Sequence, residues 1–213
     1  MKYKNVIFDL DSTLSSIEGI DELGKLRNMG ERIKSLTRQA MSGRMPFGRV
    51  FIRRLELIRP TRSELLTIGE LYKNSVTPGA PELINWLRRR GANVFVVTAG
   101  YTDCSYLLTD YLEIPRQNVF ANRLIFDAGG QFIGVDQRIP LWHGGGKRQV
   151  VSKIMAAHPG KTICVGDGIG DWEAAKVADG FIYFGGVAYR PEVAAKADIV
   201  IKERNLLTLR RYL

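Results

Sequence analysis

The sequence predicts an α/β protein with a parallel β-sheet and helices on both faces of that sheet. Five short apolar segments have the β-branched and aromatic composition of buried parallel strands: Val6–Phe8, Val94–Val97, Ile163–Val165, Phe181–Phe184 and Ile199–Ile201. Segments with helical periodicity separate the last four, and this alternation is typical of a parallel sheet. The ligand site of such a sheet lies at the carboxyl ends of its strands.

Two of the intervening helices have clear sequence signals. The apolar residues Leu83, Ile84 and Leu87 lead into Arg88–Arg90 and then Gly91, which places cations and a left-handed terminator at a helix C-terminus. The next helix carries an apolar stripe with the spacing i, i+3, i+4, i+7, i+8, and its members are Cys104, Leu107, Leu108, Tyr111 and Leu112. Both helices therefore have an apolar face to pack on the sheet.

Two segments interrupt the alternation. Residues 17–76 contain helical patterns without a strand candidate, including a capping box at Thr61 and Glu64 and a stripe formed by Ile33, Leu36, Ala40 and Met41. We expect a small helical cap over residues 17–76, inserted after the first strand into an α/β core of residues 1–16 and 77–213. The second interruption, Val119 to Ile139, contains Asp127-Ala128-Gly129-Gly130 and predicts a β-hairpin.

Composition narrows the class of protein. The 213 residues are 45% hydrophobic and 25% charged, with a net charge of +9, but the Lys and Arg residues are spread along the chain. This distribution favours a small anionic substrate over nucleic acid, for which aromatic and basic residues would interleave. No apolar run is long enough for a membrane span, and no signal peptide is apparent. We expect reduced Cys104 and Cys164, a cytoplasmic location, and a monomer or homodimer.

Pairs of acidic residues follow two of the predicted strands. Asp9 and Asp11 end the first strand, where alternation would point both side chains the same way. Buried charge needs a cation, a shared proton or a reaction, although Asp-x-Asp alone is more often a surface turn. Asp167 and Asp171 follow the third strand, and singly each is an ordinary turn or helix N-terminal acid. Four acids at one sheet edge suit Mg²⁺, which binds carboxylates together with phosphate oxygens.

Two further polar clusters fall at the same edge of the sheet. Thr98-Ala99-Gly100 follows the second strand, and Gly144-Gly145-Gly146-Lys147 precedes a helix. A P-loop is excluded because Arg148 stands where a Ser or Thr would bind magnesium and because no strand precedes the glycines. Lys147 is the obvious cation near the acids, so we favour a role in the site over a solvated helix start.

An arginine lies within an apolar stripe of the cap. On a helix beginning near Phe47, the residues Phe47, Phe51, Arg54 and Ile58 share one face. Arg54 is central to that stripe, which favours a ligand-binding role over an arginine that reaches solvent from the stripe's edge.

Taken in order, the motifs Asp9-Leu10-Asp11-Ser12-Thr13, Thr98, Lys147 and Gly166-Asp167-Gly168-Ile169-Gly170-Asp171 resemble the haloacid dehalogenase (HAD) superfamily of phosphotransferases. Within it the chain resembles the phosphoserine phosphatases over nearly its whole length. That narrower resemblance includes Glu18–Leu23, Asn118–Leu124 and Phe184-Gly185-Gly186. It implies a Rossmann-like core (HAD fold) with a helical-bundle cap.

The resemblance also implies the catalytic roles. Asp9 would be the nucleophile that becomes an aspartyl-phosphate, and Asp11 would protonate the leaving oxygen and then activate water. When two nearby carboxyl groups lie in different environments, one can be ionised while the other keeps its proton, so the site has both a base and an acid. Asp9, the main-chain carbonyl of Asp11, and Asp167 would bind Mg²⁺, with Asp171 supporting that shell. Lys147, the Thr98 hydroxyl and main-chain N–H groups would bind the remaining phosphate oxygens.

By the same resemblance, Arg54 binds the substrate carboxylate and Glu18 the substrate ammonium. Ser12 either contacts phosphate or shapes the turn, and Met41 and Phe47 close over the ligand or form cap core. The resemblance also carries three substrate-binding positions, Ala99, Gly100 and Gly170. The family usually has Ser-Gly-Gly where this chain has Thr98-Ala99-Gly100, and it has Thr or Asn where this chain has Gly170. These departures bear on substrate choice.

The activity implied is Mg²⁺-dependent hydrolysis of O-phospho-L-serine, the last step of serine biosynthesis. The alternatives are hydrolysis of another small phosphomonoester and phosphotransfer to an alcohol. A non-catalytic regulator or RNA-binding module is a further alternative, which the basic composition alone supports.

Overall fold

The centre of the molecule is a six-stranded parallel sheet with the strand order β3-β2-β1-β6-β7-β8. The computed structural model describes residues 1–41 and 44–213, and Met41 by its backbone only. The strands are β1 (Asn5–Phe8), β2 (Asn93–Tyr101), β3 (Val119–Asn122), β6 (Thr162–Gly166), β7 (Phe181–Phe184) and β8 (Ile199–Ile201). Phe8, the last residue of β1, pairs with Val96 of β2 and Val165 of β6. The chain thus continues on one side of β1 and later returns on the other, which makes the end of β1 the switch point of the sheet.

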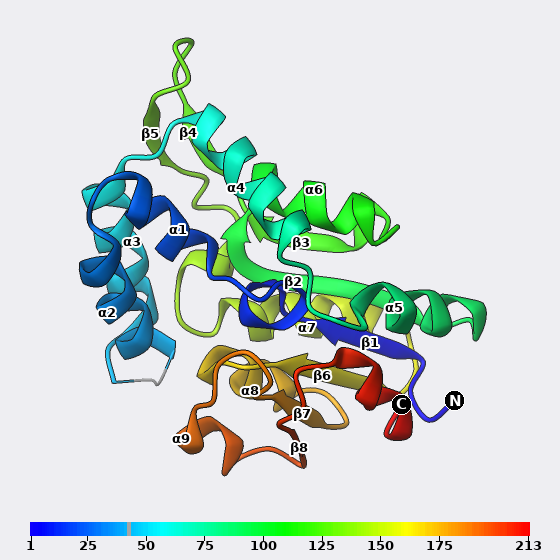
Figure 1. Cartoon of the computed structure of the whole chain (residues 1–213). Helices are drawn as coiled ribbons and strands as arrows, with labels where there is room; N and C mark the ends of the chain where they lie inside the picture. Colours follow the sequence, from blue (N-terminus) through cyan, green and yellow to red (C-terminus); the bar gives the residue numbers. More distant parts are fainter. Residues whose placement is uncertain (42–43) are drawn as a thin grey trace.

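Helices cover both faces of this sheet, as predicted (Figure 1). Phe8 and Val96 belong to one core with α5 (Ala80–Arg89), α6 (Thr102–Tyr111) and the C-terminal turn Leu206–Arg211. Ile7 and Phe95 belong to the other core with α7 (Gly146–Ala157), α8 (Ile169–Ala175) and α9 (Pro191–Ala194). Strand side chains alternate between the two cores because they alternate between the faces of a sheet.

Helices between the first two strands of the chain lie at the end of the sheet where β1 finishes (Figure 1). They are α1 (Gly19–Leu26), α2 (Gly30–Met41), α3 (Phe47–Ile58) and α4 (Arg62–Asn74). The predicted capping box begins α4, since Thr61 and Glu64 each accept a hydrogen bond from the other's main-chain N–H. α4 also packs closely on α6, because a Cβ on Gly69 would lie 3.0 Å from Leu107.

Two sequence predictions need correction. The hairpin predicted over 119–139 is confined to β4 (Leu124–Phe126) and β5 (Phe132–Val135), while Val119–Asn122 is β3 and pairs with β2 in the main sheet. Burial of Val119 and Ala121 explains why these residues pair with the core instead of extending the hairpin. In the stripe predicted for α6, Tyr111 is 49% exposed, whereas Cys104, Leu108 and Leu112 are buried. Within the described residues, no helix is long and apolar enough to span a membrane.

Candidate active site

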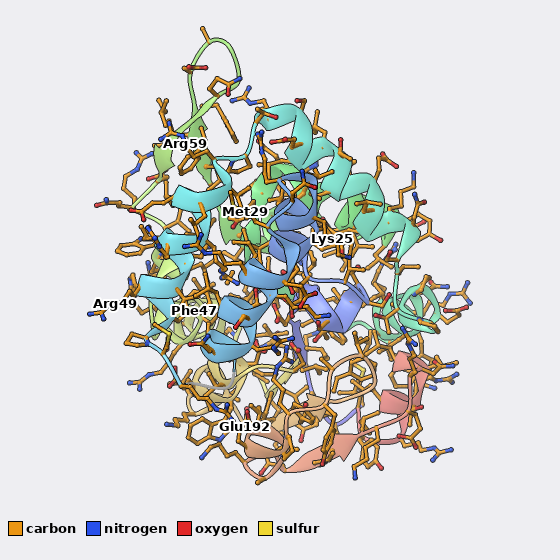
Figure 2. The ribbon with its side chains drawn as sticks, turned by 60° about the vertical axis from the view of Figure 1, so that its left-hand side comes forward. Lys25, Met29, Phe47, Arg49, Arg59 and Glu192 are labelled. Atoms are coloured by element: carbon orange, nitrogen blue, oxygen red, sulfur yellow. The ribbon has the colours of Figure 1, made fainter. Side chains whose placement is uncertain are left out.

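A pocket lies at the carboxyl ends of β1, β2 and β6, beneath α1 to α4. Ten of the predicted site residues line it: Asp9, Asp11, Glu18, Phe47, Arg54, Ala99, Gly100, Lys147, Gly170 and Asp171. Figure 2 shows Phe47 on the inner side of α3 and Arg49 on its outer side, as the predicted stripe requires. The fold therefore brings together residues that lie more than 160 positions apart in the sequence.

Three acids form a buried cluster at one end of the pocket. Asp9, Asp167 and Asp171 each offer one carboxylate oxygen, and these atoms all lie within 4.8 Å of one another. Asp9 immediately follows β1, Asp167 immediately follows β6, and Asp171 lies in the first turn of α8. The Gly168 N–H donates to Asp171 Oδ2 at 2.9 Å, which fixes one of the three carboxylates. Parallel strand ends thus converge on one point of the sheet edge.

Two basic side chains contact the acid cluster. Lys147 Nζ lies 2.7 Å from Asp9 Oδ1 and 2.7 Å from Asp171 Oδ1. Arg190, which no sequence signal indicated, pairs with Asp167 and lies 3.4 Å from Glu18 Oε1. The expectation that Lys147 is the obvious cation here is therefore incomplete, because Arg190, from the loop before α9, pairs with Asp167, the third acid of the cluster.

Burial and mutual repulsion perturb these carboxyl groups. Burial, followed by the charge of Asp171, raises the pKa of Asp9 well above its usual value. Burial also raises the pKa of Asp167 to about 6, against the opposing pull of Arg190. Burial disfavours the charged form of Lys147, but the carboxylates of Asp171 and Asp9 outweigh that effect and raise the Lys147 pKa. The cluster is thus an energetically costly accumulation of negative charge.

The donor set fits a hard divalent cation. Asp167 Oδ1 is buried and has no hydrogen-bond partner among the described residues. Carboxylate oxygens are the ligands that Mg²⁺ prefers, and a cation would stabilise the ionised form of each acid. Asp9, Asp167 and Asp171 are the residues that could hold it.

Asp11 lies apart from this cluster. β1 ends at Phe8, and Leu10–Leu14 form a turn in which Asp11 has an extended backbone (φ −63°, ψ 134°) and Ser12 has a φ of 53°. The expectation that Asp9 and Asp11 share one strand face is therefore wrong, because Asp11 is no longer on the strand. Asp11 Oδ1 accepts hydrogen bonds from the Tyr72 hydroxyl at 2.5 Å and from the Gly19 N–H at 2.7 Å. Both acids nevertheless line the same pocket.

Arg54 is a buried cation on α3 with free hydrogen-bonding capacity. Its side chain is 5% exposed, and Nη1 donates to Thr37 Oγ1 at 3.0 Å. Thr37 in turn donates to Asp21 Oδ1 at 2.5 Å, so the guanidinium is oriented through a neutral hydroxyl. Its Nε has no partner among the described residues. The side chain can therefore take an anionic group in the pocket.

Glu18 is the acid at the N-terminus of α1. Its Oε1 accepts a hydrogen bond from the Ser12 hydroxyl at 2.8 Å, and it lies beside Arg190. Burial, followed by the charges of Asp11 and Asp167, raises the pKa of Glu18 well above its usual value. Ser12 thus contacts Glu18 and is set behind the lining of the pocket.

The segment after β2 forms another wall. Gly100 N–H donates to Thr98 Oγ1 at 2.9 Å, and the Thr98 hydroxyl lies 3.3 Å from Asp11 Oδ2. The Asn122 amide donates to the Ala99 carbonyl at 2.9 Å, which fixes that carbonyl from behind. Thr98 is fully buried, so Ala99 and Gly100 line the pocket while Thr98 supports them.

The structure thus places Ser12, Thr98 and Asp167 immediately behind the pocket and the ten other described residues on its surface. The side chain of Met41 lies outside the described residues. Sequence reasoning assigned no role to Tyr72, Arg190 or His143, although Tyr72 and His143 line the pocket and Arg190 pairs with its acids. No local pattern indicated them, because Tyr72 continues an ordinary apolar stripe and the other two lie on loops.

A parallel α/β sheet whose strand ends gather these carboxylates and a lysine is the arrangement of the haloacid dehalogenase-like hydrolases. The model of that family matches residues 3–179, and the chain belongs to it. A similar relative is the phosphoserine phosphatase of Bos taurus, which is 38% identical over 93% of this chain and 88% of its own length.

Two solved structures are similar over nearly the whole chain. A phosphoserine phosphohydrolase-like protein from Francisella tularensis is 27% identical, with a TM-score of 0.91 and 99% of each chain covered. A phospho-aspartyl intermediate analogue of a phosphoserine phosphatase is 30% identical, with a TM-score of 0.88 and 100% of each chain covered.

Proposed function

We propose that this protein is a Mg²⁺-dependent phosphatase that hydrolyses O-phospho-L-serine to L-serine and phosphate. The observation that carries the proposal is that Arg54 and Glu18 line the same pocket as the cluster of Asp9, Asp167 and Asp171. A substrate with a carboxylate, an ammonium and a phosphate group needs one cation, one anion and one phosphate-binding site. The likeness to phosphoserine phosphatases supports the same assignment.

The reaction proceeds in two displacements. A carboxylate oxygen of Asp9 attacks phosphorus as the bond to the serine oxygen breaks, and Asp11 donates a proton to that oxygen. Water then attacks the phosphorus of the aspartyl-phosphate, Asp11 accepts the water proton, and the Asp9 carboxylate leaves. Dividing one difficult hydrolysis between two steps is nucleophilic catalysis. The separate surroundings of Asp9 and Asp11 support these different roles.

The remaining residues stabilise the negative charge of the phosphoryl group. Asp9, Asp167 and Asp171 would hold Mg²⁺, with the main-chain carbonyl of Asp11 also available; the bound ion neutralises charge on the phosphoryl oxygens. Lys147 keeps its proton beside Asp9 and stabilises further negative charge there. Its preorganised ammonium needs no reorientation during the reaction, which is why such groups stabilise transition states strongly.

Substrate selection is assigned to the helical segment. We propose that residues 17–76 are a cap on a core of residues 1–16 and 77–213, with Arg54, Phe47, Met41 and Glu18 supplied by the cap. Ala99, Gly100 and Gly170 limit the space on the core side of the pocket, and Thr98 and Ser12 hold the polar groups behind it. We also propose that the enzyme acts in serine biosynthesis and in the cytoplasm.

Phosphate release from a panel of esters tests the proposal. With Mg²⁺ present, phosphoserine should give the highest kcat/KM in a panel that includes phosphothreonine, 3-phosphoglycerate and ethanolamine phosphate. A better substrate without an ammonium or a carboxylate would refute the assigned specificity. A second experiment adds alcohols to the assay as competing acceptors of the phosphoryl group. The yield of inorganic phosphate should stay unchanged, whereas a loss of phosphate matched by a new phosphate ester would show transfer to the alcohol.

A further inference from the structure

The hydroxyl of Tyr72 makes a contact that the proposed chemistry does not yet use. Tyr72 lies on α4, is 1% exposed, and its hydroxyl lies 2.5 Å from Asp11 Oδ1. The second hydrogen bond to the same oxygen comes from the Gly19 N–H at 2.7 Å. Two donors from the helical segment therefore engage one oxygen of the Asp11 carboxyl group.

The other oxygen of Asp11 lies in different surroundings. A Cβ built on Gly100 would lie 3.1 Å from Asp11 Oδ2, and Gly100 lines the pocket. Oδ2 accepts one hydrogen bond, from the Thr98 hydroxyl at 3.3 Å, which is longer than either of the two hydrogen bonds to Oδ1. Because Oδ1 accepts two short hydrogen bonds, a proton on this carboxyl group belongs on Oδ2, which lies beside the pocket wall.

The local packing is specific for this contact. A Cβ on Gly19 would lie 2.1 Å from the Tyr72 hydroxyl, so only glycine at position 19 allows the hydroxyl its place. Burial, followed by the charge of Asp11, raises the pKa of Tyr72 well above its usual value. The hydroxyl therefore keeps its proton and acts as a donor to Asp11.

We propose that Tyr72 is a positioning residue: its hydroxyl holds Oδ1 of Asp11 so that Oδ2 transfers the proton to and from the reacting oxygen. The inference depends on the acid–base role proposed above for Asp11. Tyr72 itself exchanges no proton with the substrate. Its contribution is orientation, which general acid–base catalysis requires as much as a suitable pKa.

The test is the Tyr72→Phe variant, which removes the hydroxyl and keeps the ring. For phosphoserine, kcat should fall about tenfold, the equivalent of one hydrogen bond to a charged group, while KM stays within about twofold. Tyr3→Phe is the matched control, since Tyr3 is also buried but precedes β1 at the opposite end of the sheet. A rise in KM that accounts for the whole loss, or no loss, would overturn the inference.

An aryl ester separates the two halves of the reaction. Nitrophenolate leaves without a proton, so the first step with p-nitrophenyl phosphate should be unchanged in Tyr72→Phe. Hydrolysis of the aspartyl-phosphate still needs Asp11 as a base, so the variant should release nitrophenolate in a burst before a slower steady state. An equal loss in the first step for both esters would contradict a role through Asp11.

A double-mutant cycle with Asp11→Asn completes the test. If Tyr72 acts through Asp11, adding Tyr72→Phe to Asp11→Asn should cost no further activity, whereas two independent effects would multiply. If Tyr72→Phe fails to fold, Gly19→Ala displaces the same hydroxyl and takes its place in the cycle. Failure of the proposed function is distinguishable, because wild-type protein would then lack phosphoserine turnover while the aryl ester still reports the Asp11 coupling.

Discussion

Arg54 offers the sharpest test of substrate recognition. We expect Arg54→Met, which keeps an apolar stem and removes the guanidinium, to reduce kcat/KM for phosphoserine while sparing ethanolamine phosphate. The two esters differ only in the carboxylate. Because Arg54 is 5% exposed and its Nε lacks a partner among the described residues, the substrate carboxylate would lose a buried ionic partner.

The size of the effect follows from that burial. Removing one partner of a buried ion pair costs about 3–5 kcal/mol, which corresponds to at least about a hundredfold in kcat/KM. Ethanolamine phosphate should lose less than about threefold, because its phosphate and ammonium still have their own partners. Steady-state phosphate release for both esters, with thermal unfolding as a check on folding, measures the difference.

Arg53→Met is the matched control. Arg53 is the preceding residue on α3, but its side chain is 54% exposed and its ion pair with Glu56 has an N–O distance of 3.4 Å. Such an exposed pair contributes little, so the control should match the wild type on both esters. An equal loss on both esters in Arg54→Met, or a similar loss in Arg53→Met, would refute carboxylate recognition by Arg54.

Two further predictions concern the acid cluster. Burial raises the Asp167 pKa to about 6, and a proton on Asp167 competes with a cation. Mg²⁺ affinity measured by calorimetry should therefore rise as pH increases through 6 and then level off. Constant affinity from pH 5 to 8 would contradict this. A Cβ on Gly166 would lie 2.3 Å from Asp171 Cγ, so Gly166→Ala should lower Tm and weaken Mg²⁺ binding. Gly91→Ala is its control: Gly91 has a φ of 72° and no atom within 4 Å of the added Cβ, so it should cost about 1 kcal/mol and leave Mg²⁺ binding intact.

The sequence predicts the sheet well because its strands carry their own signal. Phe181–Phe184 and Ile199–Ile201 coincide with β7 and β8, since short buried parallel strands consist of continuous apolar residues. β3 was merged with the hairpin because Val119–Asn122 has no local feature that distinguishes pairing with β2 from pairing with Leu124–Phe126. That choice depends on tertiary contacts, which adjacent residues do not encode.

The candidate site likewise contains residues that the sequence could place and residues that depend on tertiary contacts. The converging ends of β1 and β6 follow from strand order, so Asp9, Asp167 and Asp171 could be predicted to meet. The contribution of Arg190 could not be predicted. Its partner Glu18 is 172 positions away, and Arg190 lies on a loop, where no periodicity indicates which way a side chain points. The orientation of Asp11 was also missed, because alternation assumes a strand that continues to Asp11, whereas β1 ends at Phe8 and the chain turns at Ser12.

The most direct measurement identifies the residue that carries the phosphoryl group. Enzyme mixed with phosphoserine and Mg²⁺ should be quenched in acid, reduced with borohydride, which converts an aspartyl-phosphate to homoserine, and sequenced by mass spectrometry. We predict homoserine at position 9, and its absence from Asp9→Asn or from protein mixed without substrate. Homoserine at another aspartate, or phosphoserine turnover with Asp9 unmodified in every quenched sample, would contradict nucleophilic attack by Asp9.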